Sequence, residues 1–201
     1  MVFDKELISA KLRRWEEYLS RYELPSWNDI PDLGLYMEQV IILLKDYLDY
    51  LPPEIKEEQL ITAAAINNYV RKKVMPEPVK KKYYRIHIAY LIMICTLKQS
   101  LSISTLKTML PSDAGEDEIK KIYSSFQKRH RLSANYFIEQ IRMMAGGILD
   151  HDSGSSYMTT ESTEDLISSV SVLSGLCRLL SEKLLLLEGK TVENGGDISV
   201  D

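Results

Sequence analysis

The chain has 201 residues, of which 45% are apolar, so it can bury one sizeable core or two small ones. No apolar stretch reaches the roughly eighteen residues that a membrane span needs, and the first residues lack the pattern of a signal peptide, so we expect a cytoplasmic protein. The net charge of −4 taken alone argues against a nucleic-acid partner.

Helical periodicity dominates the first part of the chain. Residues 1–23 form an N-terminal segment in which apolar side chains between Asp4 and Tyr22 recur at helical spacing, which predicts an amphipathic helix. Prolines and turn-forming residues then predict an ordered connector in which Trp27 and Ile30 pack inward. A second apolar stripe, which begins at Leu33, predicts a helix over residues 33–48 that ends before two consecutive prolines.

A short capped helix follows. Thr62 has the side chain of an N-cap, and the helix is expected from Ala63 to about Lys73, with Ile66 facing the core and polar residues facing outward. Two prolines end it, and residues 79–85 predict a loop or small wing. Two more helices are expected, a buried one over residues 85–99 and a short one over residues 103–110 that Ser102 caps.

Positive charge is concentrated around the predicted wing. Residues 71–85 carry seven positive charges and one negative charge, a local charge of +6, so the remaining residues sum to −10. Such a patch on an acidic protein is typical of a surface that binds a polyanion. The alternative is a helix end and a loop that are simply solvated.

The C-terminal part begins with a helical extension, residues 112–146, in which acidic residues at 116–118 start a helix and a second helical run covers residues 135–145. Residues 147–162 are rich in Ser, Gly and Thr and predict a flexible linker. Residues 163–189 predict a long helix, and residues 190–201 a disordered tail. The long helix has the a/d spacing of a dimer seam, although it could equally pack on the body of the protein. The seam residues are Leu166, Val170, Leu173, Cys177, Leu180, Leu184 and Leu187.

The predicted fold class is therefore all-α, since no run has the period-two pattern and turn residues of a hairpin. Within residues 24–111 the order is helix, connector, capped helix, basic wing and two helices. In helix-turn-helix proteins the second helix lies in the major groove while flanking cations neutralise phosphates. Asn67 and Asn68 could make bidentate contacts to adenine, and the lysines would bind phosphates. The expected DNA-binding residues are Thr62, Ala63, Asn67, Asn68, Arg71, Lys72, Lys80, Lys81, Lys82, Tyr83 and Arg85.

These residues also carry a resemblance. Ile61-Thr62-Ala63-Ala64-Ala65-Ile66-Asn67-Asn68-Tyr69-Val70, Met75-Pro76-Glu77-Pro78 and Lys82-Tyr83 are similar to the DNA-binding domain of the MerR family. Leu24-Pro25-Ser26-Trp27, Ile30-Pro31-Asp32 and Val79-Lys80-Lys81-Lys82-Tyr83 more closely resemble a group of bacterial proteins classed as a domain of unknown function. The resemblance implies a MerR-like winged helix-turn-helix core with additional C-terminal helices, acting as a dimeric transcription regulator on double-stranded DNA.

The chain departs from the MerR pattern in two places. Asn67 and Asn68 stand where MerR proteins commonly carry Arg and Tyr, and the connector over residues 52–60 is longer than a typical helix-turn-helix turn. The resemblance names no effector, so a small-molecule effector is left unknown, and a homodimer without a membrane partner is expected.

Other functions have weaker support in the sequence. No acid–base pair, activated nucleophile or phosphate-binding loop is visible, so we expect no enzyme and no catalytic residues. Cys95 and Cys177 lie in apolar helical runs, and the three histidines lack metal-ligand spacing, so we expect reduced cysteines, no metal and no cofactor. The main alternative is a protein-interaction module built on a degenerate winged helix. RNA binding is a further one, since Tyr83 and Tyr84 beside lysines could stack on bases.

Overall fold

The computed structural model describes residues 4–51, 60–144, 163–185, 187 and 189–196, which form an all-helical fold. The β-structure in these residues consists of two isolated bridges. None of the helices among them is long and apolar enough to cross a membrane. The helices are α1 (Lys5–Arg21), α2 (Met37–Tyr47), α4 (Ala63–Arg71), α5 (Arg85–Leu97), α6 (Ile103–Met109), α7 (Glu116–Met144) and α9 (Thr163–Leu185).

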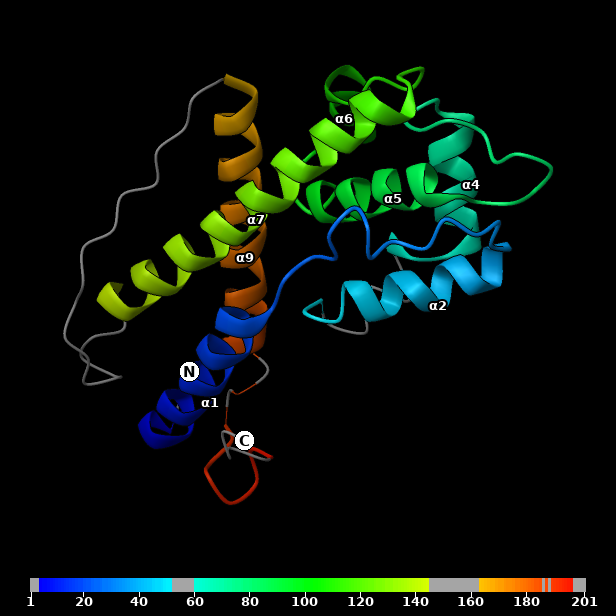
Figure 1. Ribbon diagram of the computed structural model, residues 1–201. Coiled ribbons are helices and arrows are strands. Elements are labelled where there is room, and N and C mark those ends of the chain that lie inside the picture. Colours follow the sequence, from blue (N-terminus) through cyan, green and yellow to red (C-terminus); the bar gives the residue numbers. More distant parts are fainter. Residues whose placement is uncertain (1–3, 52–59, 145–162, 186, 188, 197–201) are drawn as a thin grey trace.

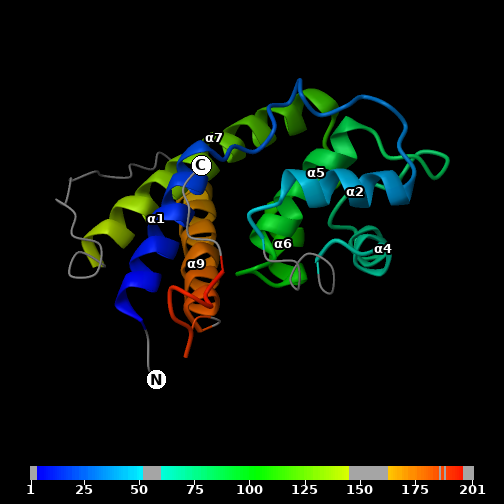
Figure 2. The same ribbon diagram turned by 90° about the horizontal axis from the view of Figure 1, so that it is seen from below.

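The helices form two groups, which α7 joins (Figures 1 and 2). In both views α2, α4, α5 and α6 lie on one side of the molecule, while α1 and α9 lie on the other. Along its length α7 contacts α5 in the first group and both helices of the second group, and α5 also contacts α9. This arrangement places α4, and the loop that follows it, on the side away from the chain termini.

Local sequence signals set several helix boundaries. The side chains of Thr62 and Ser102 each accept a hydrogen bond from the backbone N–H three residues further on, which confirms the predicted starts of α4 and α6. The second helix was expected from Leu33, but α2 begins at Met37. The preceding backbone is extended there because Leu35 pairs with Tyr83, which leaves the Leu33 side chain 66% exposed.

The core is built around α5. All eleven residues from His87 to Leu97 are buried, and α2, α7 and α9 pack against them. The connector before α2 also contributes, because Trp27 and Ile30 are buried as predicted. Burial raises the pKa of the Cys95 thiol to about 12, so Cys95 packs as a small apolar group.

α7 is one continuous helix of 29 residues, whereas the sequence predicted two separate helical runs. His130, Ser133 and Ala134 are buried in the intervening stretch, between Phe126 and Phe137. Steps of three and four residues keep all five side chains on one face, so the inward stripe is unbroken. The sequence did not indicate this periodicity, because the residues that continue the stripe here are small or polar rather than large and apolar.

α9 packs on the body of the protein, which was one of the two predicted alternatives. Val172, Leu176 and Leu179 are buried, and the Ser100 hydroxyl donates to the carbonyl of Ser171 at 2.6 Å. The buried stripe is therefore shifted by one residue from the predicted seam. Two of the seven predicted seam residues, Leu166 and Val170, have side chains that the structure does not describe. Of the other five, Leu187 is buried, Cys177 is exposed, and three are half-buried: Leu173, Leu180 and Leu184. Cys177 is exposed because it lies beside the inward stripe.

Residues 189–196 form hydrogen-bonded turns in a segment that was expected to be disordered. The N–H of Gly195 donates to the carbonyl of Thr191 at 2.8 Å, and the Thr191 N–H donates to the Asn194 side chain at 2.8 Å. A Cβ added to Gly195 would lie 2.4 Å from the Leu7 side chain, so glycine permits the close contact with α1. The predicted linker, residues 147–162, lies outside the described residues.

Candidate functional site

α4 presents a polar face to solvent. Ile66 is fully buried, while Ala63, Asn67 and Arg71 are exposed at steps of four residues and therefore share the opposite face. The Arg71 guanidinium donates to the Asn68 side-chain oxygen at 2.9 Å. This bond engages one of the two predicted amides with its own helix, so the exposed Asn67 is the one that faces outward.

The basic segment after α4 folds into a tight hairpin. The backbones of Val79 and Lys82 pair through two hydrogen bonds, each with an N···O distance of 3.0 Å. Lys80 and Lys81 lie between them with φ of 49° and 63°, and both side chains are exposed. Positive φ at both central residues defines a type I′ turn, which strongly prefers Asn-Gly.

Lys73 is a third lysine in the left-handed region, with a φ of 55°. It follows the C-cap of α4, where its N–H donates to the carbonyl of Val70 at 2.9 Å and the N–H of Val74 donates to the carbonyl of Tyr69 at 3.1 Å. These two bonds form a Schellman motif, in which glycine usually occupies the place of Lys73. Every non-glycine residue with positive φ among the described residues is one of these three lysines.

Lysine is an unfavourable residue at all three positions. In the left-handed conformation the Cβ crowds the following carbonyl, which costs roughly 1–2 kcal/mol per residue, and glycine avoids this contact. The chain thus keeps positive charge where glycine or asparagine would fold better. Strained backbone of this kind gathers at functional sites. We define the basic surface as Arg71, Lys72, Lys73, Lys80 and Lys81, all of which are exposed.

The hairpin is fastened to the segment that precedes α2. Leu35 and Tyr83 exchange two backbone hydrogen bonds of 2.9 and 2.8 Å. A Cβ added to Gly34 would lie 2.7 Å from Lys82 Cδ, so glycine permits the Lys82 stem to cross the backbone there. The Lys82 ammonium lies 5.4 Å from the centre of the Tyr36 ring. The wing and the start of α2 are therefore held as one unit.

His87 fastens the base of the wing from inside. Its Nδ1 accepts the N–H of Tyr84 at 3.0 Å, and its Nε2 lies 3.0 Å from the carbonyl oxygen of Glu77. The ring makes both bonds only as the neutral tautomer that carries its hydrogen on Nε2. Burial lowers the pKa of His87, which favours this neutral form.

Two of the predicted DNA contacts are directed inward. Tyr83 is only 3% exposed, its ring centre is 5.8 Å from that of His87, and burial raises its pKa. The Arg85 Nε donates to the carbonyl of Ile30 at 2.8 Å, and its guanidinium lies 6.0 Å from the Trp27 ring centre. These two side chains therefore anchor the wing to the core. Tyr83 is buried, which corrects its expected DNA contact, while Arg85 is half-buried.

The other predicted residues are accessible. Ala63, Asn67, Arg71, Lys72, Lys80 and Lys81 are exposed, and Thr62, Asn68 and Lys82 are half-buried. The structure thus brings α4 and the wing tip together on one side of the molecule (Figures 1 and 2).

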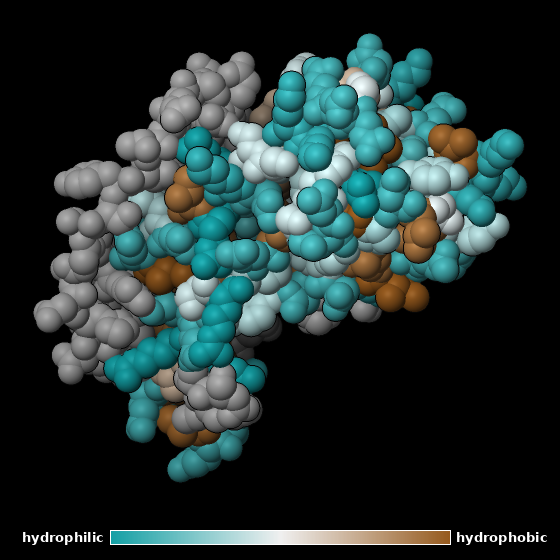
Figure 3. Space-filling view, viewed as in Figure 1, coloured by the Kyte–Doolittle hydropathy of each residue, from teal (hydrophilic) through white to brown (hydrophobic). Residues whose placement is uncertain are grey.

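Exposed apolar side chains accompany these basic and polar groups. Leu33, Tyr36 and Val79 are each more than half exposed, and Ile42 on α2 is 68% exposed. Brown side chains interrupt the teal surface on this side of the molecule (Figure 3). The region therefore offers apolar contacts as well as positive charge.

The sequence predicted a loop or small wing over residues 79–85 but not its tight turn or its anchors. Residues 79–82, Val-Lys-Lys-Lys, contain no Gly, Asn or Asp that would indicate a turn. Lys73 likewise carries no sequence signal for a left-handed cap. Within the described residues, no three His, Cys, Asp or Glu side chains are grouped as metal ligands.

The sequence model of one protein family matches residues 25–126, and that family is described as a domain of unknown function (DUF1836). The match covers the connector, α2, α4, the wing, α5 and α6, together with the start of α7. No curated protein and no solved structure matches the chain.

Proposed function

The chain belongs to the DUF1836 family, whose function is unknown, and we propose that it is a DNA-binding transcription regulator rather than an enzyme. In this proposal the core is a MerR-like winged helix-turn-helix. α2 and α4 are the helix-turn-helix pair, α4 enters the major groove, and the hairpin of residues 79–82 is the wing.

The observation that supports the proposal most directly is the placement of the three strained lysines. Lys73, Lys80 and Lys81 carry their charge into solvent from backbone positions that favour glycine or asparagine. A solvated loop gains nothing from such residues, whereas a surface that binds phosphates gains from each cation. Binding energy to a polyanion would offset the cost to the fold.

α4 supplies the groups that would read sequence. Asn67 offers an exposed amide that can form two hydrogen bonds with adenine, and Ala63 near the start of the helix is small enough for a close approach to base edges. Arg71 and the lysines of the basic surface contribute affinity without sequence choice.

The test is the salt dependence of duplex binding, measured by fluorescence anisotropy with a labelled fragment. Lys80→Ala/Lys81→Ala is compared with the wild type. Alanine keeps the Cβ, so the substitution removes charge while leaving the backbone strain in place. The control is Lys120→Ala/Lys121→Ala, a pair of exposed adjacent lysines on α7.

We expect the log–log slope of affinity against salt to become shallower by about 1.8 in the wing variant, at about 0.9 for each lost phosphate contact, and to stay unchanged in the control. Equal slopes in the two variants would exclude the wing as the DNA contact. Absence of binding at low salt would reject the regulator proposal.

We also propose that the regulator is a homodimer that uses the outer edge of α9. Cys177 is exposed and Leu173, one turn before it, is half-buried, so this edge of the helix is left for a partner. Two copies would then present their α4 helices to half-sites about 34 Å apart.

A protein-interaction module is the second candidate. The exposed side chains of Leu33, Tyr36, Ile42 and Val79 favour it, because exposed apolar groups suit a protein partner better than a phosphate backbone. Substitution of Ile42 by Ser separates the two, since it should weaken a protein complex and leave duplex binding unchanged.

A further inference from the structure

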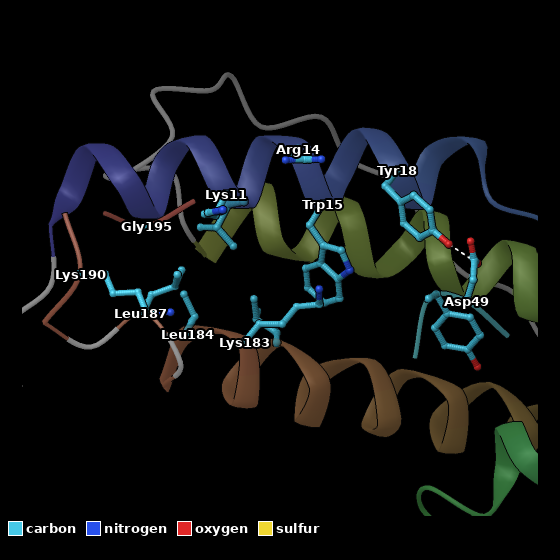
Figure 4. A pocket seen from close by; sticks show the side chains of 13 residues that line it. Lys11, Arg14, Trp15, Tyr18, Asp49, Lys183, Leu184, Leu187, Lys190 and Gly195 are labelled. Carbon is cyan, nitrogen blue, oxygen red and sulfur yellow. Dashed lines mark hydrogen bonds between the residues drawn. The ribbon is translucent and has the colours of Figure 1, made fainter. Parts of the chain in front are cut away.

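A pocket of about 510 Å³ lies between α1, α9 and the turns at residues 189–196 (Figure 4). Its volume is in the range of small-molecule sites in proteins. Leu12 of α1 and Leu180, Leu184 and Leu187 from the α9 side give it apolar walls. The pocket is formed by segments far apart in sequence, and it lies on the other helix group from the basic surface.

Four basic side chains and a single carboxylate line this pocket. They are Lys11 and Arg14 of α1, Lys183 of α9, Lys190 of the turns, and Asp49, which accepts a hydrogen bond from the Tyr18 hydroxyl. The pKa of Lys183 is lowered, first by burial and second by the charge of Lys11. An anion beside Lys183 would oppose both effects, because a nearby negative charge favours the ammonium form.

Trp15 adds a hydrogen-bond donor without a partner. The residue is only 9% exposed, and its Nε1 is buried with no acceptor. The ring is held by an edge contact with Phe137, at 5.3 Å between centres, and by the Lys183 ammonium 5.3 Å from its centre. It extends from α1 into the space that faces α9 (Figure 4). Buried indole N–H groups normally have an acceptor, which a ligand oxygen would provide here.

We propose that this pocket binds a small organic anion with an apolar body, of the carboxylate class. Lys11 and Lys183 hold the anionic group, the leucines and the Trp15 ring contact the apolar body, and the indole N–H donates to a ligand oxygen. An inorganic anion would leave the apolar walls uncovered, and a neutral apolar molecule would place no negative charge beside the Lys183 ammonium. The site shares no residue with the basic surface, so it stands independently of DNA binding.

The test uses two probes with the same aromatic body. 8-Anilinonaphthalene-1-sulfonate carries one negative charge, and N-phenyl-1-naphthylamine is the same molecule without the sulfonate. Both are titrated into the full chain and followed by probe fluorescence, with stoichiometry from calorimetry. The variants are Lys183→Met and Lys11→Met, which remove a charge and retain an unbranched side chain, and the control is Lys107→Met at an exposed position on α6.

We expect one sulfonate probe per chain and at least tenfold weaker binding in each pocket variant, as for a lost charge-assisted contact. The control should bind like the wild type, and the neutral probe should bind more weakly than the anionic one and equally well to every variant. Lys183→Met removes a partly buried charge, so the variant should fold, and its thermal midpoint checks this. Sulfonate affinity that is unchanged in both pocket variants, or equal affinity for the two probes, would overturn the proposal.

Discussion

The turn at Lys80-Lys81 makes a prediction in which stability and binding change in opposite directions. Replacing the pair by Asn-Gly supplies the residues that a type I′ turn prefers. Lys81→Gly relieves roughly 1–2 kcal/mol of left-handed strain and adds about 0.5–1 kcal/mol of backbone entropy cost. Lys80→Asn contributes about 0.5 kcal/mol more, since asparagine tolerates this conformation better.

The double variant should therefore be more stable than the wild type by about 1 kcal/mol, which for a chain of this size raises the thermal midpoint by about 2–4 °C. Its hydrogen bonds between Val79 and Lys82 are unaffected, because they involve backbone atoms alone. The same variant loses two exposed charges, so the salt slope of duplex binding should become shallower by about 1.8.

Calorimetry gives the midpoint, and anisotropy across salt gives the slope. Lys80→Ala/Lys81→Ala is the matched control, because it loses the same charges and keeps a Cβ at both positions. It should weaken binding to the same extent without the gain in stability. A double Asn-Gly variant that is less stable than the wild type would refute the left-handed turn, and one that is more stable with unchanged binding would refute the role of the lysines.

Three further outcomes follow from individual contacts. Burial lowers the pKa of His130 from 6.5 to about 4, so as the pH falls the unfolded chain binds a proton on this residue before the folded chain does. The free energy of unfolding should therefore fall by about 3 kcal/mol between pH 6.5 and pH 4. Urea unfolding across this range should show the loss, and His130→Phe should abolish this part of it. Gly34→Ala places a Cβ against Lys82 and should cost about 1–2 kcal/mol in urea unfolding, which Lys82→Ala should partly restore if this contact is the cause. Cys177→Glu should turn the proposed dimer into a monomer in sedimentation, while Ser104→Glu at an exposed position on α6 should not. A dimer that survives Cys177→Glu would exclude this edge of α9 as the interface.

The elements that the sequence predicted are those whose signals are local. Thr62 and Ser102 cap their helices through the next turn of backbone, and the apolar stripe of α1 depends on spacing alone. The wing geometry depends on contacts between distant segments. Tyr83 is buried because it pairs with Leu35, which no periodicity within residues 79–85 could indicate.

The same limit applies to the inward face of α9. The heptad pattern of leucines predicted a stripe at Leu173, Cys177 and Leu180, and the buried stripe is one residue away, at Val172, Leu176 and Leu179. Leucines surround this helix on several sides, so its sequence permits either face to pack. The choice is made by α7 and α5, which contact it.

α2 connects the two proposed sites. Leu35, just before α2, pairs with the wing, and Asp49 and Tyr50, just after it, line the pocket. Between these ends Val40 and Leu44 are fully buried, so the helix is fixed to the core. An anion that binds only the folded chain stabilises it by RT ln(1 + [L]/Kd), and the stabilised fold includes the α2 to wing connection. This gain in folding stability requires no second conformation of the chain. Occupancy of the pocket would therefore raise the fraction of folded chains that can bind duplex DNA, and the increase would be largest in variants of low stability.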